Sequence, residues 1–303
     1  MPQDRGTAAD IEWPKTTREI REGLVDSTRW NDVRFRASDI FVDTFAKSGT
    51  NWIKQIVAQL IYGGAEDRLG MVMGPYLEMT WGPPLEAGLA HYEREADPRL
   101  FGSHLPLDAL PFSPDVRYLC MGRDARDIVW SAHNHRANYT PALIELVGDA
   151  PGWSPDIRAY YRHWLEHDDG MGIWAGSLWR YARACWAARK LPNVLLVHFN
   201  DLKTDLGGEI RRVAAYLDIP IDEAKWPAIL EHCSFAYMRE AASKLELLKR
   251  NFREGGKTII NKGTNGRWKD VLSEEEIARC DEVAVEKLGR DCAHWLKTGE
   301  LPA

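Results

Sequence analysis

The sequence predicts an α/β fold with a central parallel sheet that is flanked by helices on both faces. Apolar runs typical of strands occur at residues 39–46, 116–121 and 193–199. Helical spacing of apolar residues follows the first and third runs, and a helix-start pattern follows the second. Strands that are separated by helices form parallel sheets whose two faces are both covered.

The length and composition predict a globular protein. The chain has 303 residues, of which 45% are hydrophobic and 28% are charged. We expect a flexible N-terminal tail over residues 1–14 and a single domain over residues 15–303, because the sequence has no internal repeat and no linker. The net charge of −6 disfavours nucleic acid as a partner, so an anionic ligand would need a local cationic site.

The sequence also predicts a cytoplasmic protein. No apolar run approaches the roughly 20 residues that span a bilayer, which argues against stable membrane insertion. The first residues lack the basic and apolar regions of a secretory signal. The five cysteines form no CxxC pair, so we expect reduced and mostly buried thiols.

The first predicted elements lie before residue 64. Residues 16–24 have the composition of a helix, and residues 39–46 predict the first strand. After a sharp turn at residues 47–50, a second helix ends at Gly63 and Gly64. Its apolar side chains recur at helical spacing and are Trp52, Ile53, Ile56, Val57, Leu60 and Ile61.

The later elements repeat this order. The second strand, residues 116–121, precedes Asp124 and Asp127, which are typical capping acids of a helix N-terminus. The third strand, residues 193–199, precedes a helix through Ile210, Val213, Ala214 and Leu217. From residue 222 onward the pattern is mostly helical, with a break around residues 263–268.

The turn after the first strand is a candidate anion site. In an open parallel sheet, ligands bind beyond the carboxyl ends of the strands, where helix N-termini present amide donors. Lys47 adds a positive charge there, Gly49 permits close backbone approach, and hydroxyl or amide donors come from Ser48, Thr50 and Asn51. A capped helix beside a surface lysine is the structural alternative.

A nucleoside triphosphatase is disfavoured. The Walker A pattern places its lysine after the glycine, whereas Lys47 precedes Gly49. The other near match, around Lys257, has Asn251 in place of the first glycine and no strand before it.

Three segments together resemble the cytosolic-type sulfotransferases. These are AKSGTNW (residues 46–52), GRDARDIVWS (122–131) and KGTNGRW (262–268), similar in order to the family's 5′-phosphosulfate loop, 3′-phosphate segment and late phosphate motif. Residues 103–111 and 233–238 support the likeness. The resemblance implies a P-loop-like α/β fold and sulfuryl transfer from 3′-phosphoadenosine 5′-phosphosulfate (PAPS) to an acceptor, leaving adenosine 3′,5′-bisphosphate (PAP).

The resemblance also implies roles for residues. His104 would be the general base, and Lys47 would bridge the sulfate and the departing 5′-phosphate within the loop that contains Ser48, Gly49, Thr50 and Asn51. The 3′-phosphate would contact Arg123, Ser131, Lys262 and Gly263, and the adenine would lie near Trp52, Phe199 and Phe235. We expect no metal, because a sulfuryl group carries less negative charge than a phosphoryl group and no acidic cluster demands one.

Four departures from the family pattern predict weaker donor binding. Asn51 stands where Thr or Ser is usual, and Gly102 stands where many relatives have a lysine, so one charge stabiliser is missing. Phe199 replaces a frequent tyrosine, and Asn261 replaces an arginine. No C-terminal dimerisation motif is recognisable, so a homodimer is unsupported and the oligomeric state stays open.

The acceptor is predicted to be a small lipophilic phenol or alcohol. Glycolipid and amine acceptors, and a module that binds PAP without catalysis, are alternatives. A remote one is a metallopeptidase, because His163, Glu166 and His167 match the HxxEH pattern.

Overall fold

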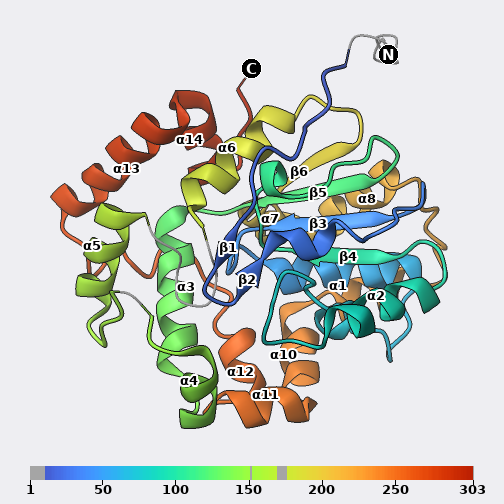
Figure 1. Ribbon diagram of the computed structural model, residues 1–303, viewed down its shortest axis with the longest axis horizontal. Helices are drawn as coiled ribbons and strands as arrows, with labels where there is room; N and C mark the ends of the chain where they lie inside the picture. The colour runs from blue at the N-terminus through green and yellow to red at the C-terminus, as the bar shows by residue number, and fades with distance from the viewer. Residues whose placement is uncertain (1–10, 151, 169–175, 303) are drawn as a thin grey trace.

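The computed structural model describes residues 11–150, 152–168 and 176–302. Its central sheet contains four parallel strands in the order β4-β3-β5-β6 (Figure 1). The strands are β3 (Ile40–Thr44), β4 (Leu100–Ser103), β5 (Arg117–Gly122) and β6 (Val194–His198). The predicted α/β class, with its parallel sheet, is confirmed.

Helices follow the three predicted strands. The loop after β3 leads to α1 (Thr50–Ile61), β5 leads to α3 (Ala125–Ala137), and β6 leads directly to α7 (Phe199–Thr204) and then to α8 (Leu206–Tyr216). Asp124 caps α3 as predicted, since its carboxylate accepts from the amide of Arg126 at 2.8 Å.

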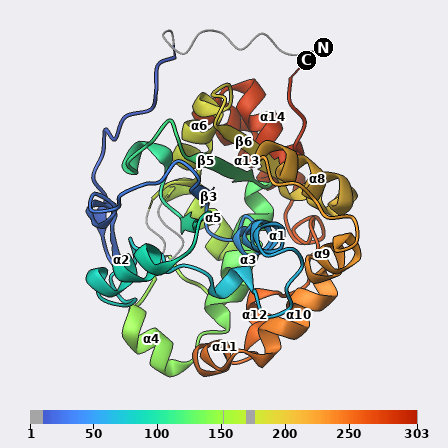
Figure 2. The same cartoon turned by 90° about the vertical axis from the view of Figure 1, so that its right-hand side faces the viewer.

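Helices cover both faces of the sheet (Figure 2). Phe41 packs on one face, whereas its neighbours Ile40 and Val42 pack on the other, because strand side chains alternate. The first face contacts α3, α5 (Ile157–His167), α6 (Leu178–Ala188), α13 (Glu274–Leu288) and α14 (Arg290–Thr298). The second contacts α1, α8 and α9 (Trp226–His232).

Four short helices lie together away from α13 and α14 in both ribbon views (Figures 1 and 2). They are α4 (Pro141–Val147), α10 (Phe235–Lys244), α11 (Glu246–Asn251) and α12 (Gly256–Ile259). A small separate core of Tyr139, Leu143 and Phe252 joins α4 to α11. An isolated bridge between Tyr139 and Phe252 fixes the two segments to each other.

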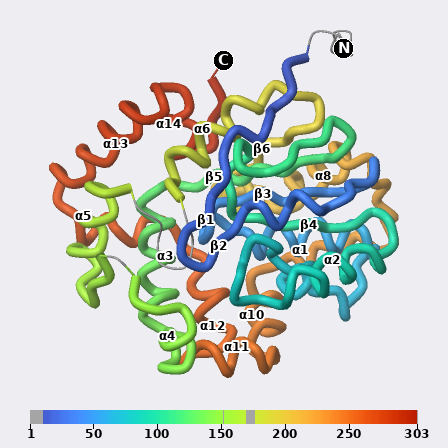
Figure 3. The backbone as a smooth tube through the Cα atoms, viewed as in Figure 1, coloured from blue at the N-terminus to red at the C-terminus, as the bar shows by residue number. Residues whose placement is uncertain are grey.

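The helix predicted over residues 16–24 is wrong. The segment forms the short antiparallel strands β1 (Arg21–Glu22) and β2 (Val25–Asp26), joined by a turn in which Gly23 has φ 55°. The amide of Ile20 donates to Ser27 Oγ at 2.9 Å, and the amide of Thr17 donates to the Asp108 carbonyl at 3.0 Å. These tertiary bonds outweigh the weak helical composition, and Figure 3 traces the resulting extended arm. Most of the predicted tail lies outside the described residues.

The sequence analysis missed β4. This four-residue edge strand contains Gly102, which weakens any strand pattern. Its position matters because it ends one residue before His104.

Between β3 and β5 the chain also forms α2 (Leu85–Arg94) and the 3-10 turns η3 (Gly70–Val72) and η4 (Leu107–Ala109). All five cysteines are buried and free, as predicted. Within the described residues, no helix combines the length and apolar character needed to cross a membrane.

Candidate active site

A cavity of about 740 Å³ lies where the carboxyl ends of the strands meet α10, α11 and α12. Every predicted site residue lines it except Ser48. Five cationic side chains line the cavity against one carboxylate, that of Glu246, and they are Lys47, Arg123, Lys203, Lys262 and Arg267. The whole chain has a net negative charge, so an anionic ligand would need a local group of cations. This cavity provides one.

The loop between β3 and α1 is tightly constrained. Lys47 has φ 70°, which is uncommon for a residue with a side chain, and Gly49 has φ 124°. This φ favours glycine, and a Cβ on Gly49 would also crowd the end of the Met121 side chain. Ser48 is buried and its hydroxyl donates to the Phe45 carbonyl at 2.7 Å. The Ser48 side chain therefore stabilises the turn. It does not reach the cavity, although its predicted role in ligand binding requires that it should.

Lys47 has unusual electrostatics. Burial, reinforced by the positive charge of Arg123, lowers the pKa of the Lys47 ammonium to about 7. A bound anion would oppose both effects, because it would replace lost solvation and neutralise the repulsion. The lysine is thus suited to an anionic ligand.

His104 is held in one tautomer. Its Nδ1 lies 2.8 Å from the carbonyl oxygen of Thr44, and since a carbonyl only accepts, Nδ1 carries the proton. The neutral ring then has its lone pair on Nε2. Burial lowers the pKa of the imidazole to about 4, with further lowering by Lys54 and Lys47. At neutral pH the ring is a proton acceptor.

Two residues that sequence reasoning missed support His104. Glu78 is fully buried, and its carboxylate accepts from the His104 amide at 2.9 Å and from Ser103 Oγ at 3.0 Å. The ring of Tyr76 stacks on the imidazole with centroids 4.7 Å apart. No motif marks either residue, because both lie in an irregular segment before α2.

Arg123 connects the three phosphate motifs. Its guanidinium donates to the Lys47 carbonyl at 3.0 Å and to Asn265 Oδ1 at 2.8 Å, and it lies 4.0 Å from the Phe199 ring centroid. Its buried Nε has no hydrogen-bond partner among the described residues. An orphaned buried donor costs free energy, so the site fits an anionic group.

Asp127 has a further role beyond the predicted cap. Its carboxylate accepts from the Gly266 amide at 2.7 Å, which ties the late motif to α3. Lys203 holds the same motif by donating to the Gly263 carbonyl at 2.8 Å. The structure therefore brings together segments that lie 139 and 60 residues apart in the chain.

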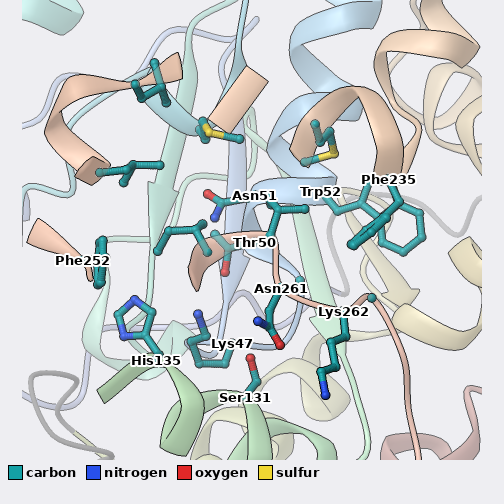
Figure 4. Close-up of a pocket in the computed structure, with 18 of the residues that line it drawn as sticks. Lys47, Thr50, Asn51, Trp52, Ser131, His135, Phe235, Phe252, Asn261 and Lys262 are labelled. Carbon is teal, nitrogen blue, oxygen red and sulfur yellow. The ribbon is translucent and has the colours of Figure 1, made fainter. Parts of the chain in front are cut away.

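Aromatic side chains form one end of the cavity (Figure 4). Trp52 donates from Nε1 to the Cys233 carbonyl at 2.9 Å and meets Phe199 edge-on at 5.3 Å. Phe235, 36% exposed, lies against Gly263, where a Cβ would be 2.7 Å from its ring. Flat faces at this end suit a stacked heteroaromatic ring.

The other end of the cavity is mostly apolar. In Figure 4, His135 and Phe252 lie on the side of Lys47 opposite to Trp52 and Phe235. His135 is buried, with Nδ1 3.1 Å from the Tyr139 hydroxyl and its ring 4.9 Å from that of Phe252. Leu143 and Leu248 pack with Phe252 in one small core. Other apolar side chains that line the cavity include Met71, Val72, Met79, Trp81 and Leu247.

The HxxEH pattern lies on α5, away from the cavity. His163 and His167 stack at 4.1 Å, and Glu166 is exposed. In the described part of the chain, only Asp43, Cys120 and Cys185 form a group of three or more side chains that could hold a metal ion, and it excludes this motif. A metallopeptidase finds no support in this arrangement.

Comparison with known proteins identifies the family. A family model described as "Sulfotransferase domain" matches residues 37–291. The "Glycolipid sulfotransferase" of Mycobacterium bovis is 27% identical and covers 95% of this chain and 97% of its own. "Sulfotransferase 1A1" of Rattus norvegicus is 26% identical over 91% of this chain and 87% of its own.

Solved structures share the fold. A mouse sulfotransferase complexed with PAP has a TM-score of 0.69 and 19% identity, covering 91% of this chain and 93% of its own. Retinol dehydratase in complex with androsterone and PAP has a TM-score of 0.66 and 19% identity, covering 87% and 86%. With the family model matching most of its length, this chain belongs to the sulfotransferase family.

Proposed function

We propose that this protein transfers a sulfuryl group from PAPS to the hydroxyl of a lipophilic acceptor. One observation carries the proposal: a single cavity brings a half-buried neutral histidine and a half-buried lysine beside a cationic phosphate-type site. The names of the relatives and the PAP complexes of the structural neighbours agree with it.

The residues present fit the donor. When bound, PAPS supplies an activated sulfuryl group with the 5′-phosphate of PAP as its leaving group. Trp52 and Phe235 would hold the adenine, while Arg123, Ser131 and Lys262 would hold the 3′-phosphate. The orphaned Nε of Arg123 is the donor that such a phosphate would satisfy. The amides at the start of α1 would face the 5′ end.

His104 and Lys47 divide the chemistry. His104 Nε2 would take the acceptor hydroxyl proton as the new sulfur–oxygen bond forms and the bond from sulfur to the 5′-phosphate oxygen breaks. Lys47 would neutralise the charge that moves onto that oxygen. No metal is needed for these steps, because the lysine and the loop amides supply the positive partners.

The acceptor class follows from the apolar end of the cavity. A lipophilic phenol or alcohol would bury its ring or chain against Met79, Trp81 and Phe252 while its hydroxyl approached His104. Relatives named for a glycolipid and for a 3-alpha-hydroxysteroid make lipid alcohols a second candidate. Val72 and Leu247 line the cavity and are 56% and 57% exposed, so an apolar chain could extend past them.

Calorimetric titration with PAP, run beside adenosine 5′-monophosphate and ATP, tests the donor site without an acceptor. We expect a clear preference for PAP, and equal or absent binding would contradict the proposal. Turnover of PAPS with a naphthol, a sterol, a glycolipid and an aromatic amine would then define the acceptor. Tight PAP binding without turnover on any of them would favour a non-catalytic binding module.

A further inference from the structure

A second buried lysine lies behind the candidate base. Lys54, on α1, is 1% exposed, although lysine is almost never buried without a partner. Its ammonium donates to the Met73 carbonyl at 2.6 Å and lies 4.8 Å from the centroid of the Tyr76 ring. Tyr76 is the same ring that stacks on His104 at 4.7 Å. A cation, an aromatic ring and the imidazole are therefore in consecutive contact.

Gly102 faces this ammonium. A Cβ on Gly102 would be in ordinary contact with Lys54, 3.5 Å from both its Cδ and its Nζ, so a longer side chain there would point into the space that the lysine fills. Gly102 is two residues before His104, at the carboxyl end of β4. The sequence predicted a missing charge stabiliser at Gly102, but the structure places the amine of Lys54 beside this position from a different element.

The charges around His104 show what this amine can do. Lys47 faces the imidazole from the loop after β3 and His135 faces it from α3, while Glu78 lies at the His104 amide. Glu78 and Glu95 are the acidic groups that face Lys54. A buried carboxylate beside His104 would favour the protonated ring, and a nearby ammonium offsets it. Burial lowers the pKa of Lys54 only to about 8, so the amine is still mostly charged at pH 7.

Lys54 also fixes the wall that carries Tyr76. Besides the bond from Lys54 to Met73, the neighbouring Gln55 accepts from the Gly70 amide at 2.8 Å. Gly70 packs so closely on the backbone of α1 that no Cβ fits there. The segment from Gly70 to Met79, which supplies part of the apolar lining, is therefore anchored on α1.

We propose that Lys54 is a positioning residue for the transfer reaction, whose buried ammonium holds the Tyr76 ring against His104 and opposes protonation of the imidazole. This inference rests on the proposed role of His104 as the base. Lys54 does not line the cavity, so it acts through Tyr76 and through its charge.

The test separates charge from packing. Lys54→Gln keeps an N–H donor for the Met73 carbonyl but removes the charge, Lys54→Met removes both, and Lys225→Met is a control that removes a distant surface charge. The His104 ring is titrated by NMR in each protein, its signal assigned by loss in His104→Ala. We expect Lys54→Gln and Lys54→Met to raise the ring pKa by about one unit, with no change in the control. An unchanged titration in both variants would overturn the proposal.

A double variant extends this test. In Lys54→Met/Gly102→Lys, the new lysine would start from the position that faces the vacated space, and we expect the ring titration to return toward that of the wild type. If the Lys54 variants fail to fold, Tyr76→Leu is the second route. We expect Tyr76→Leu to lower kcat while the affinity for PAP stays the same. An unchanged kcat would contradict the proposal. The ring titration needs no acceptor, so a failure of sulfuryl transfer itself would be recognised separately.

Discussion

His104 Nδ1 lies 2.8 Å from the carbonyl oxygen of Thr44, the last residue of β3. Lys47 follows Thr44 by three residues, in the loop that Gly49 and Ser48 constrain. The candidate base and the candidate charge stabiliser are thus both fixed to the carboxyl end of one central strand. Positions set by a sheet are more precise than positions set by a free loop, which favours a preorganised site.

Replacing His104 with Ala removes the proton acceptor and leaves the phosphate-type site intact. We expect kcat to fall by about 10²–10⁴, the usual contribution of a general base. PAP affinity, measured by calorimetry, should remain close to that of the wild type. His133→Ala is a matched control, because His133 lies on α3 with Nε2 3.1 Å from the Ser154 carbonyl and does not line the cavity. Wild-type turnover in His104→Ala would reject the base assignment.

Replacing Lys47 with Met should act mainly on rate. Methionine keeps the length of the side chain but cannot neutralise the leaving oxygen, so we expect kcat to fall by about 10²–10³. PAP affinity should change less, since the proposed phosphate contacts of Arg123 and Lys262 would remain. Comparing single-turnover rates with calorimetric affinities measures the two effects separately. A large loss of affinity at unchanged rate would assign Lys47 to binding alone.

Replacing Arg123 with Ala should weaken PAP binding by about 10- to 100-fold, because a charge-assisted hydrogen bond contributes about 1.5–3 kcal/mol. Adenosine 5′-monophosphate lacks the 3′-phosphate, so its affinity should hardly change. Arg211→Ala removes an exposed guanidinium that pairs with Glu223 far from the cavity, and serves as the control. Equal losses for both nucleotides would mean that Arg123 only supports the loop through its bond to Lys47.

The sequence predicted the elements with strong periodicity. The strand before Lys47 and the helix behind it combine an apolar pattern with turn signals, the capping acids Asp124 and Asp127 predict the start of α3, and all three elements form as expected. The prediction of a helix over residues 16–24 failed because hydrogen bonds to Ser27 and Asp108 fix the backbone of this segment. Both partners lie outside the segment in the sequence.

Part of the site was also predictable and part was not. Motifs predicted residues that the structure places around one cavity, with Ser48 as the exception. Supporting residues such as Glu78 and Tyr76 act through contacts with distant segments, and no local pattern marks them. The position of Lys54 beside Gly102 is likewise visible only in the packing of α1 against β4.

The last prediction concerns pH. His104 must be neutral to accept a proton, and its pKa is lowered to about 4, so kcat/KM should fall only as the pH drops through about 4. Lys47 must be charged to stabilise the leaving oxygen, and its pKa is lowered to about 7, so kcat/KM should fall as the pH rises through about 7. A nucleotide bound as proposed would add negative charge beside Lys47 and raise its pKa, which should move the alkaline limb of kcat upward relative to that of kcat/KM. Lys47→Arg keeps its charge at all accessible pH values, so its lower activity should show no fall between about pH 7 and pH 9. If the alkaline limb were identical in Lys47→Arg and in the wild type, the limb would belong to another group.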